Sequence, residues 1–449
     1  MNLPLLGKFS LDRTLAFDRV RSTTAAQFLA DAAALAAQLP ARAHVLNDCA
    51  DRYHFMVGFA AAMKRNQVSL LPSSRVEHVW RQLVQDYPDS YVLTDQRDVP
   101  AVAEVMFFPP LEAGESVDLA TPGFPEAQLA AVAFTSGSTG RPKPVLKYWG
   151  SVAREAQAAG TRLMLDPGRA GAIVATVPPQ HMYGFLASVL LPLQFGHAVT
   201  RERPFYPEDV RIIAESSPVK PALVITPVQL RACVLERTRL PPLSFVLSSA
   251  APLPSAVARE AETLFEAPVL EFYGSTETGA IASRRHRDTD SWRTFDGVRV
   301  RSHTQGFLVE ADYFREPVVL SDVVEILNAR EFRLVGRDSD LVKIGGKRTS
   351  LLYLNQQLQE LPGVVDGAFL VEEAKDDREP RLTAFVVAPG QSRDVVLAAL
   401  RTRIDEVFVP RRLWLVASLP RNAAGKLPRE QMLKLLETEL AREAASGNT

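Results

Sequence analysis

Residues 135–143 read Thr135-Ser136-Gly137-Ser138-Thr139-Gly140-Arg141-Pro142-Lys143, and they directly follow an apolar run from Leu129 to Phe134. A buried strand that ends in hydroxyls and glycines and then a lysine is typical of a phosphate-binding loop. Glycines let backbone N–H groups converge on an anion without a Cβ clash, and the Lys143 ammonium adds charge for distal phosphates. A flexible Ser/Gly linker has a similar composition, but the order of the whole string favours the phosphate loop.

The chain downstream of this loop alternates between strand-like and helical patterns. Short apolar runs lie at Ile173–Val177, Ala222–Thr226 and Phe245–Leu247, and the helical segments Val228–Glu236 and Ser255–Phe265 lie between or after them. This alternation predicts an α/β sheet with helices on its faces.

The remaining patterns suggest how the chain is divided. Ala25–Leu39 and Phe55–Met63 have helical spacing, while Arg299–Leu334 alternates with a period near two, as in an antiparallel or barrel-like element. The chain then restarts as a small α+β unit. We therefore expect a large N-terminal α/β body over residues 1–336 and a small C-terminal α+β lid over residues 337–449.

Composition excludes several classes of protein. The 449 residues are 47% hydrophobic and 23% charged, and the net charge is −1, so no strong overall field favours nucleic acid or an anionic membrane. Two cysteines, Cys49 and Cys233, cannot staple a chain of this length, and the N-terminus has no secretory pattern. We expect a cytoplasmic enzyme without membrane insertion. The sequence also lacks zinc-ligand clusters, a G-x-S-x-G elbow, and the Rossmann and Walker motifs.

Three further motifs follow the loop in order. They are Tyr273-Gly274-Ser275-Thr276-Glu277, then Asp322 with Gly336-Arg337-x-x-Asp340-x-x-Lys343, and finally Leu419-Pro420 through Gly425-Lys426. Together with the loop they resemble the motifs of the adenylate-forming superfamily, which includes acyl-CoA synthetases, peptide-synthetase adenylation domains and firefly luciferases. The resemblance spans most of the chain. It implies an AMP-binding and acyl-binding domain, a lid that carries a catalytic lysine, and the use of ATP and Mg²⁺.

The resemblance also assigns a nucleotide site. Asp322 would accept hydrogen bonds from the ribose, Arg337 would donate nearby, and Tyr273 would offer an aromatic face to adenine. A turn acid and a core tyrosine are the ordinary alternatives for Asp322 and Tyr273. The expected ATP- and AMP-binding residues are Thr135, Ser136, Gly137, Ser138, Thr139, Gly140, Lys143, Ser249, Ala250, Tyr273, Gly274, Asp322 and Arg337.

The expected catalytic residues are Lys426, Glu277, Thr276, His181 and Lys343. The resemblance implies that Lys426 bridges the carboxylate and the nucleotide during adenylation, and that Lys343 replaces it when the lid rotates for the second step. Glu277 suits Mg²⁺, which prefers carboxylate and phosphate oxygens. His181 would lie between the acyl pocket and the phosphates, although a core histidine is a serious alternative. Pro144 and the hinge position Ser339 depart from the family's usual residues.

The acyl pocket is expected to contain Met182, Tyr183, Phe185, Leu186 and Phe272. Leu186 stands where amino-acid adenylation domains carry an Asp for the substrate ammonium, so an α-amino acid is disfavoured. Phe272 would shorten the pocket, and Tyr183 would meet a ring hydroxyl. These residues predict a small, hydroxybenzoate-like aromatic acid.

The compact length resembles the AMP-ligases of aryl polyene and xanthomonadin pigment clusters, which load such acids onto an acyl carrier protein. The basic run Arg284-Arg285-His286-Arg287 could steer an acidic carrier protein to the site, or it could be an ordinary solvated loop. Two alternatives stay open: a ligase that uses CoA as the acceptor, and a non-catalytic nucleotide-binding protein on the same scaffold.

Overall fold

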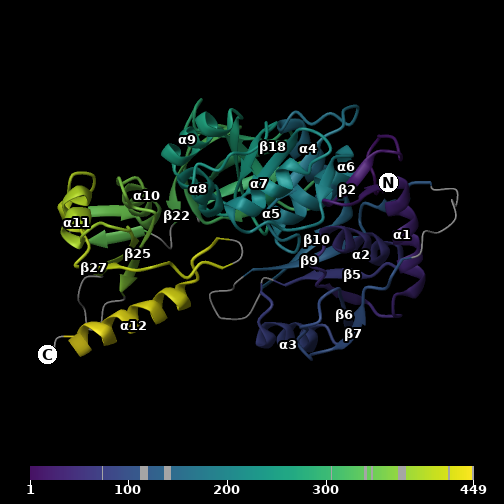
Figure 1. The fold of residues 1–449 in the computed structure, drawn as a ribbon, viewed down its shortest axis with the longest axis horizontal. Helices are drawn as coiled ribbons and strands as arrows, with labels where there is room; N and C mark the ends of the chain where they lie inside the picture. The colour runs from purple at the N-terminus through teal and green to yellow at the C-terminus, as the bar shows by residue number, and fades with distance from the viewer. Residues whose placement is uncertain are drawn as a thin grey trace.

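The structure is a computed structural model, and it describes residues 1–72, 74–111, 120–135, 143–304, 306–337, 341–344, 347–372, 381–422 and 425–446. We call residues 1–337 the body and residues 341–446 the C-terminal part. Figure 1 shows the body with the smaller C-terminal part, coloured yellow-green to yellow, at one end.

The larger sheet of the body is mixed, and its centre is parallel. Its strands run parallel to their neighbours from β2 through β12, β11, β13 and β14 to β15. Parallel strands bring their carboxyl ends to one edge, where ligands bind in open α/β sheets. Among the described residues the strand order is β21 (Asp322–Asn328), β22 (Glu331–Arg337), β17 (Trp292–Thr294), β16 (Gly279–Arg284), β15 (Val269–Ser275), β14 (Val246–Ser248), β13 (Pro221–Ile225), β11 (Ala172–Ala175), β12 (Ala198–Thr200), β2 (Thr14–Phe17) and β3 (Ser22–Thr24).

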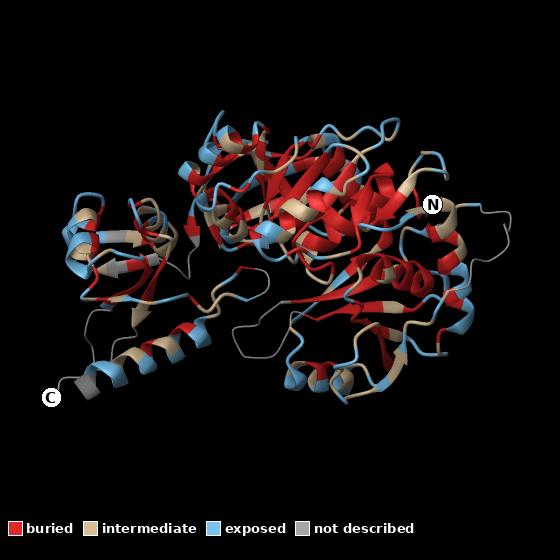
Figure 2. Ribbon diagram, in the orientation of Figure 1, coloured by how far each residue is buried: buried red, intermediate tan, exposed pale blue. Residues whose placement is uncertain are grey.

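Alternate residues of these strands face two separate cores. Val174 and Leu223 belong to the core beneath the helices α7 (Pro207–Glu215), α8 (Pro227–Leu235) and α9 (Ser255–Phe265). Their neighbours along the strands pack on the other face, against α4 (Trp149–Arg162), α5 (Met182–Phe185), the π-helical segment Leu186–Leu190 and α6 (Leu191–Phe195). Buried residues therefore fill both faces of the sheet, as Figure 2 shows in red.

A second sheet is built largely from the first 135 residues, of which the first hundred carry no motif. Its order is β10 (Lys143–Tyr148), β9 (Leu129–Thr135), β5 (Val68–Leu71), β4 (His44–Asn47), β6 (Ser90–Thr94) and β7 (Glu104–Phe107). The helices here are α1 (Ala25–Gln38), α2 (Arg52–Lys64) and α3 (Glu77–Asp86), and α2 contacts strands of both sheets, β4, β5 and β12. A helix that is apolar nearly all round, as α2 is, is expected in such a buried position.

The antiparallel pattern expected after Arg299 is present. It forms the sheet β18 (Val298–His303), β19 (Gly306–Ala311) and β20 (Val318–Leu320), beside the β21–β22 hairpin. A short pair, β1 (Asn2–Pro4) and β8 (Gly123–Pro125), completes the strands of the body.

The C-terminal part has its own apolar clusters, which include Val342, Leu358, Phe385 and Met432. Its elements are β23 (Leu341–Ile344), β24 (Lys347–Ser350), α10 (Leu351–Gln359), β25 (Asp366–Glu372), β26 (Arg381–Val387), α11 (Arg393–Arg401), a 3₁₀ turn (Glu406–Phe408), β27 (Arg412–Leu415) and α12 (Arg429–Ser446).

The expected mixed α/β class and the two helices near the N-terminus are confirmed. β22 pairs with β21 as far as Arg337, one residue beyond the expected end of the body, and Ser339 lies outside the described residues. Of the helices in the described part of the chain, none combines the length and the apolar character needed to cross a bilayer.

Candidate active site

A cleft of about 2420 Å³ lies along the carboxyl ends of the parallel strands and reaches the C-terminal part. Residues 177–184 after β11, 249–255 after β14 and 271–277 in and after β15 line it from the body, and residues 425–429 line it from the C-terminal part. Ligand pockets usually measure roughly 300–1000 Å³. The cleft therefore has room for a nucleotide and a second molecule.

Two residues expected at the nucleotide are hydrogen-bonded to each other in this cleft. The Tyr273 hydroxyl donates to Asp322 Oδ2 at 2.7 Å, and Asp322 is only 8% exposed. The Tyr273 ring packs near Trp292 and Phe332, with ring centroids 5.3 and 5.4 Å away. Tyr273 therefore both packs in the core and orients the Asp322 carboxylate at the cleft.

The turn after β14 brings backbone close to the same region. Ser249 Oγ donates to the Phe272 carbonyl at 2.9 Å. Ala250 has a φ of 76°, a left-handed conformation that non-glycine residues rarely adopt and that often marks a functional site. Small side chains in this turn leave its backbone accessible from the cleft.

Thr276 and Glu277 lie in the turn between β15 and β16, and both line the cleft. Ser275 and Thr278 fix the turn, since Thr278 N donates to Ser275 Oγ at 3.2 Å and Ser275 N donates to Thr278 Oγ1 at 3.1 Å. At Gly274 a Cβ would overlap the carbonyl oxygen of Gly279, so this motif glycine is required by close packing. The exposed Glu277 carboxylate is a hard oxygen ligand that fits Mg²⁺ bound to substrate phosphates.

His181 lies at the start of α5 and faces the cleft. Burial, together with the nearby charges of Lys426 and Arg203, lowers its pKa to about 4. The imidazole is therefore neutral at neutral pH, and it can donate or accept a hydrogen bond but carries no charge. The influence of Lys426 also shows that this lysine approaches His181.

The loop that carries Lys426 reaches the body. A Cβ at Gly425 would lie 3.7 Å from Thr226 Cβ, at the end of β13. Within the loop, Lys426 N donates to Asn422 Oδ1 at 2.9 Å. Lys426 is thus placed beside the strand ends that also position His181.

Arg421 and Asp366 brace this loop, and the sequence analysis did not identify either of them. Arg421 Nε and Nη2 donate to the two Asp366 oxygens at 2.8 Å, and Nη1 donates to the Gly425 carbonyl at 2.7 Å. The position of Arg421, directly after the Leu-Pro of the last motif, was the available signal. From the body, Arg231 of α8 donates to the Gln359 and Val364 carbonyls of the C-terminal part.

Other expected nucleotide residues are only partly described. Ser136, Gly137, Ser138, Thr139 and Gly140 lie outside the described residues. The two ends of their loop are paired, since Thr135 of β9 is opposite Lys143 of β10. The backbones of Arg337 and Lys343 lie in β22 and β23.

The expected acyl residues do not all face the cleft. Met182, Tyr183 and Leu186 line it, and so does Phe272, whose side chain is 3% exposed and packs edge-on against Phe295 at 5.0 Å.

Two expectations about the acyl pocket need correction. Phe185 is fully buried and packs between Phe55 and Phe59 in the core, because the helical turn points it away from Met182. The Tyr183 hydroxyl donates to the Leu247 carbonyl at 2.6 Å. Its proton is therefore not available to a substrate hydroxyl.

The basic run 284–287, for which the sequence left a steering role and an ordinary loop open, is paired with acids of the body. Arg284 Nε donates to Glu271 at 2.7 Å, and His286 Nε2 lies 3.1 Å from the same carboxylate. Arg285 donates to Glu262 at 2.7 and 3.0 Å. Arg287, the last residue of the run, lies 3.8 Å from the same carboxylate. These pairs leave little positive field to attract an acidic carrier protein.

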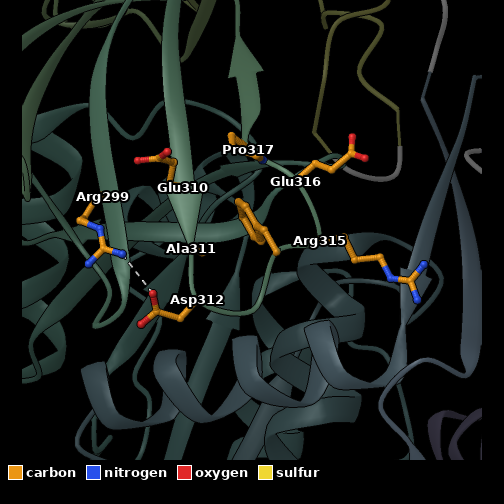
Figure 3. A pocket seen from close by; sticks show the side chains of 8 residues that line it. Arg299, Glu310, Ala311, Asp312, Arg315, Glu316 and Pro317 are labelled. Atoms are coloured by element: carbon orange, nitrogen blue, oxygen red, sulfur yellow. Dashed lines mark hydrogen bonds and ion pairs between the residues drawn. The ribbon is translucent and has the colours of Figure 1, made fainter.

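A second hollow of about 190 Å³ lies beside β18 and β19. Figure 3 shows its one ion pair, Arg299 with Asp312 at 3.2 Å, with Arg315 set apart. The two side chains are 60% and 66% exposed, so the pair contributes little. Across the residues that the structure describes, no group of three or more His, Cys, Asp or Glu side chains is arranged to hold a metal ion by itself.

The fold and this cleft define a nucleotide-dependent ligase of the adenylate-forming type, and comparison with known proteins agrees. The family model described as "AMP-binding enzyme" matches residues 11–312, more than half of the chain. The chain belongs to this family and is an AMP-forming acid–thiol ligase.

Its relatives by sequence are CoA ligases. A 4-coumarate–CoA ligase of Halorhodospira halophila is 28% identical over 305 residues, covering 65% of this chain and 73% of the relative. A 2-succinylbenzoate–CoA ligase of Bacillus cereus is 25% identical over 409 residues, covering 81% and 82%.

Solved structures share the fold. The o-succinylbenzoate CoA synthetase of Bacillus subtilis, solved with its acyl-adenylate intermediate, has a TM-score of 0.79 at 17% identity, covering 96% of this chain and 98% of that one. ATP-bound MatB from Rhodopseudomonas palustris has a TM-score of 0.77 at 21% identity, with coverage of 93% and 94%. The expected superfamily and fold are therefore confirmed.

Proposed function

We propose that this enzyme activates a small aromatic carboxylic acid with MgATP and transfers the acyl group to the thiol of a phosphopantetheine arm. The observation that carries the proposal is the single cleft that contains Asp322, Glu277, His181 and Lys426. A nucleotide, its phosphates and a carboxylate can meet there. Lys426 and Glu277 are both present, which argues against a silent nucleotide-binding protein.

In the first step, a carboxylate oxygen of the acid attacks the α-phosphorus of ATP, and pyrophosphate leaves. The Lys426 ammonium offsets the charge that builds where the carboxylate meets the phosphate. Neutral His181 contributes no competing positive charge and can hydrogen-bond an oxygen of the reacting groups. Glu277 would hold Mg²⁺, which neutralises the phosphate charge when bound.

In the second step, the thiol sulfur attacks the acyl carbonyl, the proton of the thiol is lost, and AMP leaves. We propose that the C-terminal part rotates between the steps, so that Lys343 and its neighbours replace Lys426 at the cleft.

The proposed acid is aromatic and short. The relatives' names denote ligases for coumarate and succinylbenzoate, which are both aromatic acids. Leu186 offers no charge for an amino group. Phe272, held in place by Phe295, would limit the length of the pocket and favour hydroxybenzoates.

The acceptor is CoA or a holo-acyl carrier protein, which present the same thiol arm. The relatives' names favour CoA, and the neutralised run 284–287 removes the charge argument for a carrier.

Pyrophosphate release should be measured with hydroxybenzoates, coumarate, medium-chain fatty acids and amino acids. Thioester formation should then be followed with CoA and with holo-carrier protein as separate acceptors. We expect release with hydroxybenzoates above all others. Release with none of the acids would contradict the proposed function, while release with fatty acids alone would contradict only the aromatic class.

A further inference from the structure

Two charged side chains are buried behind the turn that carries Thr276 and Glu277. Lys147 of β10 is 5% exposed, and Glu155 of α4 is 3% exposed. Buried Lys and Glu are rare unless they have partners. Neither residue has a part in the reaction described above, so their burial calls for another explanation.

Both side chains bond to the backbone of this turn. Lys147 Nζ donates to the Glu277 carbonyl at 3.2 Å, and Glu155 Oε1 accepts from Ala280 N at 2.8 Å. The two bonds hold the turn at both ends of the segment 277–280. The carbonyl that Lys147 holds belongs to the residue whose carboxylate faces the cleft.

Glycine makes this packing possible. Gly279 has a φ of 69°, and a Cβ there would overlap the Glu155 carboxylate. The carboxylate therefore rests directly against the turn backbone. A shift of Glu155 would displace the turn, because no flexible side chain lies between them.

The charges of the two residues depend on each other. Burial raises the pKa of Glu155 to about 7, while the Lys147 charge and the Ala280 N–H oppose the rise. Burial lowers the pKa of Lys147, while Glu155 and Glu277 oppose the fall. Burial, and after it the charge of Glu155, raises the pKa of the nearby Tyr313 phenol. Each charge thus makes the burial of the other less unfavourable.

Lys147 also lies on the strand that leaves the phosphate loop. β10 begins at Lys143, directly after the loop, and Lys147 is four residues further on. α4, which carries Glu155, follows immediately at Trp149. The pair therefore connects the β9–β10 hairpin and α4 to the β15–β16 turn.

We propose that Lys147 and Glu155 are a buried pair of positioning residues that fixes the Glu277 carboxylate relative to β10 and α4 and so sets how tightly the enzyme holds MgATP. The proposal rests on the proposed function, in which Glu277 contacts Mg²⁺ on the ATP phosphates. It goes further by assigning the alignment of that contact to two residues that never touch substrate.

The test uses the full-length enzyme with Lys147→Met, Glu155→Gln and the double variant. We expect Lys147→Met to raise the Mg²⁺ concentration for half-maximal pyrophosphate release and the KM for ATP. The rise should be roughly three- to tenfold, the scale of partly losing one charge-assisted hydrogen bond. The KM for the acid should stay unchanged. The double variant should recover part of the loss, because it leaves no single unpaired buried charge.

Glu155→Gln preserves the shape of the side chain, so it remains informative if Lys147→Met does not fold. In the wild type, Mg²⁺ activation should weaken as the pH falls through about 7, where Glu155 gains a proton. In Glu155→Gln this pH dependence should be absent, because an amide cannot change charge there.

Asp31→Asn is the matched control, since Asp31 is a buried acid of α1 outside the cleft lining. Equal changes in Mg²⁺ requirement for Asp31→Asn and Glu155→Gln, at equal loss of thermal stability, would overturn the positioning role. Glu277→Gln separates the two hypotheses. If it leaves Mg²⁺ activation unchanged, the proposed role of Glu277 fails. If it weakens activation while Lys147→Met and Glu155→Gln do not, only the positioning proposal fails.

Discussion

The body and the C-terminal part hold their site residues in different ways. In the body, Asp322 lies on β21, and the Tyr273 hydroxyl holds its carboxylate. Glu277 lies in the β15–β16 turn, and buried Lys147 holds its backbone carbonyl. In the C-terminal part, Lys426 lies on a loop whose brace is the Arg421–Asp366 ion pair. On the proposed function, the body provides a fixed nucleotide site, while the C-terminal part provides a lysine whose loop the Arg421–Asp366 pair braces.

The contacts between the two regions support this difference. Arg231 of the body donates to backbone carbonyls of the C-terminal part, and Gly425 lies against Thr226. These contacts involve backbone carbonyls and small side chains. The body and the C-terminal part can therefore separate at them without exposing a large apolar core. Interfaces of this kind permit relative motion of their parts.

The largest expected effect comes from removing the lysine itself. Lys426→Ala should reduce pyrophosphate release by roughly 10²–10³, the scale of losing one preorganised electrostatic group. Thioester formation from supplied acyl-AMP should fall much less, because the proposed rotation takes Lys426 away from the site before that step. Lys434→Ala on α12, an exposed lysine of the same part, is the control. Equal losses in the two half-reactions would contradict the rotation of the C-terminal part.

The next effect tests whether the body sets substrate length. Phe272→Gly should shift kcat/KM from hydroxybenzoates toward longer phenylpropenoates by roughly one to two powers of ten, because pocket-size discrimination is worth about 1–3 kcal/mol. Phe185→Leu is the control, since Phe185 packs in the core away from the cleft. A wild type that already prefers coumarate would show that Phe272 does not close the pocket.

These variants also show what the sequence could reveal. The motif residues that face the cleft, such as Thr276, Glu277 and Lys426, could be found because they lie in motifs that resemble those of the adenylate-forming superfamily. Phe185 could not be assigned correctly, because the direction of a side chain in a short helix depends on the packing around it. Tyr183 does line the cleft, but the hydrogen bond of its hydroxyl to the Leu247 carbonyl depends on the tertiary structure. The sequence spacing alone placed both residues at the same pocket.

Ion pairs between segments that are distant in the sequence could not be predicted from the sequence either. Arg284 and Arg285 look like a basic surface in the sequence, but Glu271 and Glu262 neutralise them after folding. Lys147 and Glu155 look like ordinary surface charges, and only the tertiary structure buries them. Most of the second sheet of the body was missed for a related reason, because its strands β4, β5 and β6 lie in the first hundred residues, which carry no motif.

The third prediction concerns the brace of the Lys426 loop. Arg421→Gln should reduce pyrophosphate release by about tenfold, or roughly 1.4 kcal/mol, because the Gly425 carbonyl and Asp366 both lose their donor. Asp366→Asn should have a similar effect, and the double variant should add little, since both changes break the same pair. Kinetics of the first half-reaction provide the measurement.

Arg403→Gln provides a matched control for this brace. Arg403 pairs with Glu360 at 3.0 Å in the same part of the chain, away from the Lys426 loop. We expect thermal stability to change similarly in Arg403→Gln and Arg421→Gln, with the rate falling only in Arg421→Gln. Fully additive losses in the Arg421 and Asp366 variants would show that the pair does not act as one brace.

The smallest expected effect is a shift in the pKa of His181. Burial, Lys426 and Arg203 lower this pKa to about 4. Lys426→Met removes one of the two positive charges, so the pKa should rise, while staying below the ordinary value of 6.5 because burial is the largest cause. NMR titration of the imidazole, assigned with His181→Asn, measures the shift, and Lys434→Met should cause none.

The lowered pKa of His181 also makes the free energy of unfolding depend on pH. The unfolded chain binds a proton on His181 near pH 6.5, whereas the folded protein resists it until about pH 4. The contribution of His181 to the free energy of unfolding is therefore retained above pH 6.5 and lost progressively as the pH falls from 6.5 to 4. Lys426→Met should raise the pKa of His181 in the folded protein, so that the pH range over which stability is lost becomes narrower. His181→Asn should abolish this pH dependence. If the pKa of His181 does not change in Lys426→Met, Lys426 does not lie beside the body in solution. The contrast between the fixed residues of the body and the lysine on the C-terminal loop would then lose its main support.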